Sequence, residues 1–129
     1  MILMDSDVMI DLLREYSNAT AWFDTIDKNE IMALPGFVVM ELIQGCRNKI
    51  ELEKLQRDLA MYKTVWLEPD ECVKALDIFS QNYLNHNAGL IDVLVGMTGV
   101  SLGVPLHTFN VKHYHFIPGL TTIKPYAKT

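Results

Sequence analysis

Short apolar runs alternate with longer segments of helical periodicity along this chain. Within the longer segments, apolar residues recur three or four positions apart, as they do on the buried face of a helix. Strands that alternate with helices indicate parallel βαβ units, so we expect an α/β fold with three layers, α/β/α, around a mainly parallel sheet. The predicted strands are Met1–Met4, Ile31–Leu34, Thr64–Leu67, Pro105–Phe109 and Thr121–Lys124, and the longer helices are Phe37–Cys46, Lys49–Tyr62, Pro69–Leu84 and Leu90–Leu102.

The same periodicity predicts which helix faces are buried. A further short helix follows the first strand, and Ser6 or Asp7 is expected to cap its N-terminus. The predicted inner faces are Ile50, Leu52, Leu55 and Leu59 in the helix from Lys49, and Val73, Leu76, Phe79 and Tyr83 in the helix from Pro69.

Composition is that of a single compact domain spanning residues 1–129, with 50% hydrophobic and 21% charged residues. The two cysteines, Cys46 and Cys72, lie in apolar helical patterns without metal-binding or redox spacing. Because the sequence also lacks a signal-peptide pattern, we expect buried, reduced thiols and a cytoplasmic protein. The apolar run Gly36–Met40 is far shorter than the roughly 20 residues of a membrane span.

Charge is distributed unevenly between the two parts of the chain. The net charge is −5, yet residues 93–129 contain Lys112, Lys124 and Lys128 and no acidic residue. All 16 acidic residues lie before residue 93. This division indicates either an acidic site that faces a basic rim or lysines that are simply solvated.

Four polar residues interrupt apolar segments at positions where local structure does not require them. Asp5 follows the first predicted strand, and Asn110 follows the fourth. Glu41 and Asp92 lie within almost entirely apolar helices. In a parallel α/β sheet, sites form beyond the carboxyl ends of the strands, so these side chains are expected to converge there. Taken singly, Glu41 could instead pair with a nearby basic residue, and Asp92 could cap its helix.

Converging carboxylates repel one another, and a divalent cation is the simplest group that neutralises them. Oxygen ligands without paired Cys or spaced His favour Mg²⁺ or Mn²⁺ over Zn²⁺. Such an ion can polarise a phosphoryl oxygen and lower the pKa of an attacking water. The residues therefore indicate metal-dependent hydrolysis of a phosphodiester, with Asp5, Glu41 and Asp92 as candidate metal ligands.

These motifs resemble those of PIN-domain proteins, specifically the VapC-type toxins of toxin–antitoxin pairs. The similar segments are residues 4–14, 40–46, 91–95 and 106–120, in the family's order and with similar spacing. The resemblance implies a PIN-like fold and a Mg²⁺- or Mn²⁺-dependent endoribonuclease that is usually a homodimer and is inhibited by a small antitoxin protein. RNA would be its substrate.

Carried over to this chain, the family pattern makes Asp5, Glu41 and Asp92 the acidic metal-site residues. Asn110 occupies the fourth catalytic position, where many members have Asp, so a second metal ion would be held more weakly. Ser6 and Thr108 match hydroxyl positions near the site. Where members have small residues after the third acid, this chain has Gly96 and Gly99, which would allow close approach of the helix to the sheet. Replacing Asp5 or Asp92 by Ala is expected to abolish cleavage and leave the fold intact.

Two other functions fit parts of the pattern. Asp5 and Asp7 after an apolar strand also resemble the opening of haloacid-dehalogenase-like phosphatases, but no acid follows Asp92 to complete that site. A catalytically silent PIN-like module that binds RNA or protein is the second alternative, and the three intact acids argue against it. Of the neighbouring polar residues, Asp7 is expected to cap a helix near the site and Asp11 to pair with Arg14 or another surface neighbour. Residues 113–115 are expected to form a surface loop or to stack on unpaired bases.

Overall fold

The computed structural model describes residues 1–128, which form a mixed α/β structure around one parallel sheet. Its strands lie in the order β3-β2-β1-β4-β5, and every neighbouring pair is parallel. The central strand β1 is covered on both faces, and its Leu3 and Met4 are fully buried. The strands are β1 (Ile2–Met4), β2 (Met32–Pro35), β3 (Lys63–Val65), β4 (Leu106–His107) and β5 (Thr122–Ile123).

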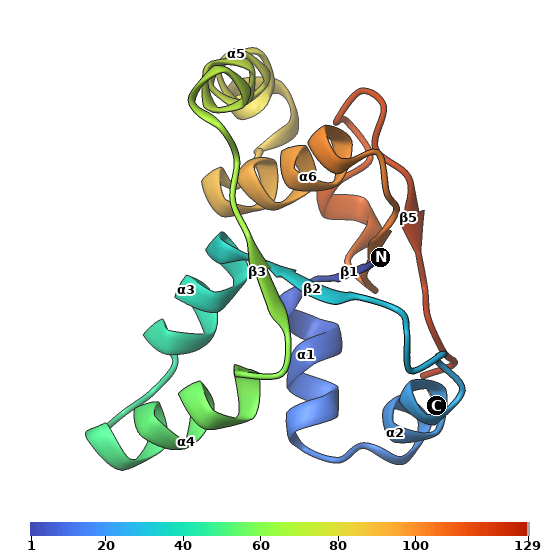
Figure 1. Cartoon of the computed structure of the whole chain (residues 1–129). Helices are drawn as coiled ribbons and strands as arrows, with labels where there is room; N and C mark the ends of the chain where they lie inside the picture. Colours follow the sequence, from blue (N-terminus) through green and yellow to red (C-terminus); the bar gives the residue numbers. More distant parts are fainter. Residues whose placement is uncertain (129) are drawn as a thin grey trace.

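Helices cover both faces of this sheet (Figure 1), with α5 and α6 on one side and α1, α2 and α4 on the other. The predicted three-layer α/β/α fold with a parallel sheet is confirmed, and the predicted elements are present within a few residues of their expected bounds. The helices are α1 (Ser6–Leu13), α2 (Ser17–Asp24), α3 (Gly36–Gln44), α4 (Lys49–Leu59), α5 (Pro69–His86) and α6 (Leu90–Leu102), and a short 3₁₀ helix η1 spans Val111–His113.

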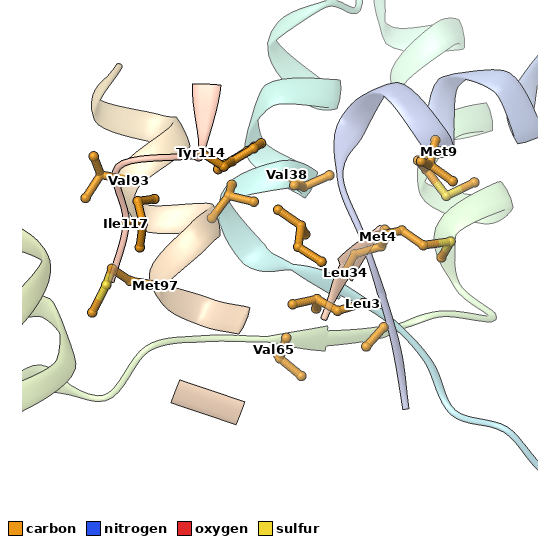
Figure 2. Close-up of a cluster of buried hydrophobic side chains, with 14 of the residues drawn as sticks. Leu3, Met4, Met9, Leu34, Val38, Val65, Val93, Met97, Tyr114 and Ile117 are labelled. Atoms are coloured by element: carbon orange, nitrogen blue, oxygen red, sulfur yellow. The ribbon is translucent and has the colours of Figure 1, made fainter. Parts of the chain in front are cut away.

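The two glycines of α6 allow a C-terminal segment to pack directly on this helix. A Cβ atom on Gly96 would lie 2.4 Å from Ile117 Cδ1 and 3.3 Å from Tyr114 Cδ1. A Cβ on Gly99 would lie 3.0 Å from Leu120 Cδ1 and 3.7 Å from Leu3 of the sheet. Figure 2 shows Tyr114 and Ile117 beside Val93 and Met97 of α6. The expected close approach therefore exists, although the nearest neighbour is the segment 114–120 rather than the sheet.

The predicted inner face of α5 is wrong. Val73, Leu76 and Tyr83 are more than half exposed, whereas Ala75 is buried and Phe79 is partly buried. This helix is an outer element that packs mainly on α6, so only a narrow face of it is covered. Three further residues depart from expectation: Ile50 is 79% exposed, and of the free cysteines Cys72 is exposed and Cys46 only partly buried.

No helix among residues 1–128 is both long enough and apolar enough to cross a membrane.

Candidate metal and nuclease site

The parallel strands bring the candidate residues to one edge of the sheet. Asp5 leaves β1 and is the N-cap of α1, and Asn110 follows the adjacent strand β4 and precedes η1. Glu41 lies in α3, and Asp92 lies in the first turn of α6, whose N-cap is Gly89. Asp92 is therefore not the cap of its helix, and Glu41 has no ion pair with the basic residues near it, because Arg47 pairs with Glu51 and Lys49 with Glu53.

Asp5 is the most firmly held of these side chains. It is 2% exposed, and its Oδ1 accepts a hydrogen bond from the backbone N–H of Ser6 at 2.7 Å. Its Oδ2 accepts hydrogen bonds from Thr108 Oγ1 at 2.8 Å and from Tyr114 OH at 2.7 Å. Asp5 thus replaces Ser6 or Asp7 as the helix cap, because the chain leaves β1 in an extended conformation that turns its carboxylate onto the first helical N–H.

Tyr114 was expected in a surface loop or on a stacking surface, and both expectations are wrong for this residue. Its ring is 2% exposed and lies beside α6, in the space that Gly96 leaves open. Burial, followed by the nearby charge of Asp5 and the hydrogen bond to it, raises the pKa of the Tyr114 hydroxyl far above its ordinary value. The hydroxyl therefore keeps its proton and acts as a permanent donor to Asp5.

We expect Tyr114→Phe to lower the free energy of unfolding by about 1.5–3 kcal/mol, the usual contribution of a hydrogen bond to a charged group. Phe fills the same space, so the change removes the donor and little packing. Urea denaturation measures the effect, with Tyr83→Phe on the exposed face of α5 as the matched control. Equal loss in both variants would contradict this role for the Tyr114 hydroxyl.

The other acids of the site carry charge that the protein does not neutralise. Burial, and then repulsion from Asp5, Asp92 and Asp7, raises the pKa of Glu41. Burial also raises the pKa of Asp92. The nearby His113 lowers this pKa in part, and the charge of Asp5 raises it further. Within residues 1–128, no Lys or Arg forms an ion pair with Asp5, Glu41 or Asp92. These side chains therefore form a region of concentrated negative charge.

Asp7 adds a fourth carboxylate and a structural link. Its Oδ1 accepts from the N–H of Val8, and its Oδ2 accepts from the N–H of Phe109, each at 2.8 Å. The second bond ties α1 to the segment that follows β4. Burial, and then the charge of Asp5, raises the pKa of Asp7 above its ordinary value. Asp7 therefore lies near the site, as predicted, but it joins two segments instead of capping the helix.

Asn110 lies at the rim of the site and is exposed. Its backbone N–H donates to Thr108 Oγ1 at 3.0 Å, which orients the hydroxyl that in turn donates to Asp5. Asp11 lies apart from this group and binds the C-terminal segment: its Oδ2 contacts Lys128 Nζ at 2.8 Å and accepts from Tyr126 OH at 2.7 Å. The expected pairing of Asp11 with Arg14 or a helix neighbour is thus replaced by a long-range contact.

Among the described residues, His113 is the only basic side chain that contacts one of the three acids. Its Nδ1 lies 3.3 Å from Asp92 Oδ2, and its side chain is 59% exposed. His113 belongs to η1, so this contact connects the segment after β4 with the first turn of α6.

The donor chemistry fits a hard divalent cation, although the side chains do not form a closed cage. No three His, Cys, Asp or Glu side chains of residues 1–128 are close enough together to coordinate an ion in their present positions. Mg²⁺ commonly uses one or two carboxylates and retains several waters, so it does not need such a cage. The raised pKa values of Glu41 and Asp92 show that both carboxylates would gain from a neighbouring cation.

Solved structures with this fold come from toxin–antitoxin complexes. A chain of VapBC-1 from nontypeable Haemophilus influenzae is 18% identical with a TM-score of 0.78, covering 97% of this chain and 98% of that chain. A toxin–antitoxin complex from Klebsiella pneumoniae gives 19% identity, a TM-score of 0.74 and 98% coverage of both chains. A chain of FitAcB from Neisseria gonorrhoeae is 16% identical with a TM-score of 0.74, and the match covers 97% of this chain and 98% of that chain. No protein-family model and no curated protein sequence matches this chain. The comparison confirms the resemblance in fold: this chain shares its three-layer, PIN-like fold with chains of VapBC and FitAB complexes.

Sequence reasoning missed Tyr114 and undervalued Asp7 and His113. Each acts through a contact between segments about 20 to 110 residues apart in the chain. No local pattern marks Tyr114 as buried, because it is flanked by His113 and His115 and its contact with Gly96 is made across the fold. For His113, no local pattern indicates that it faces Asp92.

Proposed function

We propose that this protein is a Mg²⁺- or Mn²⁺-dependent endoribonuclease and the toxin of a toxin–antitoxin pair. The observation that supports it most is the group formed by Asp5, Glu41 and Asp92, which has no Lys or Arg partner among residues 1–128, within a fold shared with chains of VapBC and FitAB complexes. Asp5, Glu41 and Asp92 would hold the metal ion, and Asn110 would lie at its edge. We also propose that the protein acts in the cytoplasm.

The metal ion would polarise the scissile phosphate and lower the pKa of an attacking water. The protein's own residues prepare the position. Thr108 and Tyr114 donate to Oδ2 of Asp5 and the N–H of Ser6 donates to Oδ1, so the carboxylate is held in one orientation. Glu41 and Asp92 approach from α3 and α6 and are less constrained, which allows them to adjust to the ion and the substrate.

Two protein partners follow from the same proposal. The similar structures are toxin–antitoxin complexes, and a small antitoxin is therefore the expected inhibitor. A pocket of about 390 Å³ between α1, α3 and α4 includes Glu41 and the apolar Leu13, Leu42 and Leu55, which suits an inhibiting segment. We further propose a homodimer formed through the exposed apolar face of α5.

Leu76→Glu tests the dimer. Leu76 is 64% exposed and lies on the same face as Val73 and Tyr83, so the change places a charge in the proposed interface without disturbing the core. We expect the molecular mass measured by light scattering to fall from that of a dimer to that of a monomer. Ile50→Glu on α4 is the control, because Ile50 is also exposed but lies on another helix. A dimer that survives Leu76→Glu would place the interface elsewhere.

The nuclease is tested by incubating purified protein, free of any co-purified partner, with total cellular RNA in Mg²⁺, Mn²⁺ or EDTA. We expect cuts at a few discrete positions with either metal ion and none in EDTA. Glu41→Gln protein is the parallel control for contaminating nucleases and should leave the RNA intact. Intact RNA under every condition would instead support the silent RNA- or protein-binding module, and cleavage that survives both EDTA and the substitution would be that of a contaminant.

A further inference from the structure

A second pocket opens directly beside Asp92. It has a volume of about 250 Å³ and lies between the C-terminal end of α5, the connection to α6 and the segment that begins at η1. Asn87 shapes its wall, because this residue adopts a left-handed conformation (φ 51°) that ends α5 and turns the chain sharply into α6. The lining residues are His86, Asn87, Ala88, Gly89, Asp92, Lys112, His113 and Phe116.

The pocket differs in charge from the carboxylate group next to it. Lys112 and His113 line it, and Asp92 is its only acidic lining residue among residues 1–128. Lys128 is bound to Asp11, whereas Lys112 is exposed and forms no ion pair with any residue of 1–128. Lys112 is one of the three lysines of residues 93–129. It lies next to the candidate site and is available to bind an anion.

Flat aromatic rings also line the pocket. The His86 ring stacks on Phe116 with an interplanar angle of 7° and a centroid separation of 5.7 Å. His86 is exposed and Phe116 partly exposed, so the stack is accessible at the pocket. Stacked rings beside a cation are the combination that binds single-stranded nucleic acid, whose bases stack on rings while phosphates contact Lys or Arg.

We propose that this pocket is a subsite for a single-stranded nucleotide of the RNA next to the scissile phosphate. Its phosphate contacts Lys112 and His113, and its base packs against His86 beside Phe116. Lys112 thereby offsets the repulsion between the RNA backbone and the carboxylates of Asp5, Glu41 and Asp92. This inference rests on the proposed function, since RNA is the substrate in both.

Binding of a fluorescein-labelled, mixed-sequence single-stranded oligoribonucleotide tests the subsite by fluorescence anisotropy. All proteins carry Glu41→Gln and are measured in EDTA, so that the RNA stays intact; Glu41 does not line this pocket. Lys112→Gln and His86→Ala are the test variants. Their matched controls are Lys124→Gln, an exposed lysine outside the pocket, and His115→Ala, whose ring also contacts His86 and Phe116 without lining the pocket.

The two test variants should weaken binding in different ways. Loss of one phosphate contact lowers the slope of log affinity against log salt by about 0.7 for single-stranded RNA, so Lys112→Gln should show this smaller slope. Loss of a stacking ring should lower affinity about fivefold at every salt concentration, so His86→Ala, measured at mildly alkaline pH, should keep the slope of the parent. Both controls should bind as the parent does.

Equal binding by test variants and controls, or no binding by the parent, would overturn the subsite. Cleavage by the unmodified protein is measured separately with Mn²⁺. If it cleaves RNA while all variants bind alike, the subsite is wrong and the proposed nuclease stands. If it fails to cleave while Lys112→Gln and His86→Ala bind weakly as described, the pocket binds single-stranded RNA, but the nuclease and the position beside a scissile phosphate are wrong.

Discussion

Asp92→Asn should reduce metal-dependent RNA cleavage by at least about a hundredfold, because it removes a carboxylate proposed to hold the metal ion. Asn has the same shape and keeps one oxygen, so the first turn of α6 and the adjacent pocket stay in place. The comparison is Asp70→Asn, which changes an exposed Asp in the first turn of α5, just as Asp92 lies in the first turn of α6. Cleavage of the RNA substrate in Mn²⁺ is measured for both variants, and comparable activities would remove Asp92 from the proposed site.

Stability separates this loss of activity from unfolding. The pKa of Asp92 is raised in the folded protein by burial above that in the unfolded chain, about 3.9. The folded state therefore holds this proton to higher pH, and the associated stability, present below about pH 3.9, is lost as pH rises through the folded pKa. At neutral pH the buried, ionised Asp92 lowers the free energy of unfolding, so Asp92→Asn should melt at the same temperature as the parent or higher. That advantage should shrink as pH falls toward about 4.

The arrangement of the sheet was predictable because its signals are local. An apolar run such as Met1–Met4 followed by a capped helix needs only residues adjacent in sequence. Parallel strand order then brings the ends of β1 and β4 together, which is why Asp5 and the segment of Thr108 and Asn110 could be placed at one edge of the sheet.

The interior faces of the outer helices were less predictable. Apolar periodicity in α5 indicated a buried stripe, yet Val73, Leu76 and Tyr83 are exposed. Periodicity shows that a helix has an apolar face, but it does not show whether the same chain or another molecule covers that face. In the proposed dimer, a second copy of the chain would cover the apolar face of α5 that is exposed in the single chain.

Side-chain contacts across long sequence separations were not predictable from one sequence. Tyr114 reaches Asp5 over 109 positions, and Asp7 accepts a bond from the backbone of Phe109. Whether a tyrosine hydroxyl faces solvent or a buried carboxylate depends on the packing around it. Here that packing depends on Gly96, whose missing Cβ leaves space for the Tyr114 ring.

This network changes the expectation for Asp5. The sequence suggested that Asp5→Ala would leave the fold intact, but alanine removes the acceptor used by Thr108, Tyr114 and the N–H of Ser6. The two hydroxyls are buried, and a buried donor without a partner costs about 1–3 kcal/mol. We therefore expect Asp5→Ala to lower the free energy of unfolding by about 2–5 kcal/mol, measured by urea denaturation.

Asp5→Asn is the variant that distinguishes structure from chemistry at this position. Its carbonyl oxygen still accepts from Thr108 and Tyr114, while its amide faces the N–H of Ser6, so the loss should be near 1 kcal/mol. Both Asp5 variants should lose RNA cleavage, because neither presents a carboxylate to a metal ion. If Asp5→Ala proved as stable as Asp5→Asn, the hydroxyls of Thr108 and Tyr114 would have found other partners, and these hydrogen bonds would not be what holds Asp5. A stable Asp5→Asn protein without cleavage, beside an unstable Asp5→Ala protein, would show that the fold needs a hydrogen-bond acceptor at this position and that the proposed chemistry needs the carboxylate.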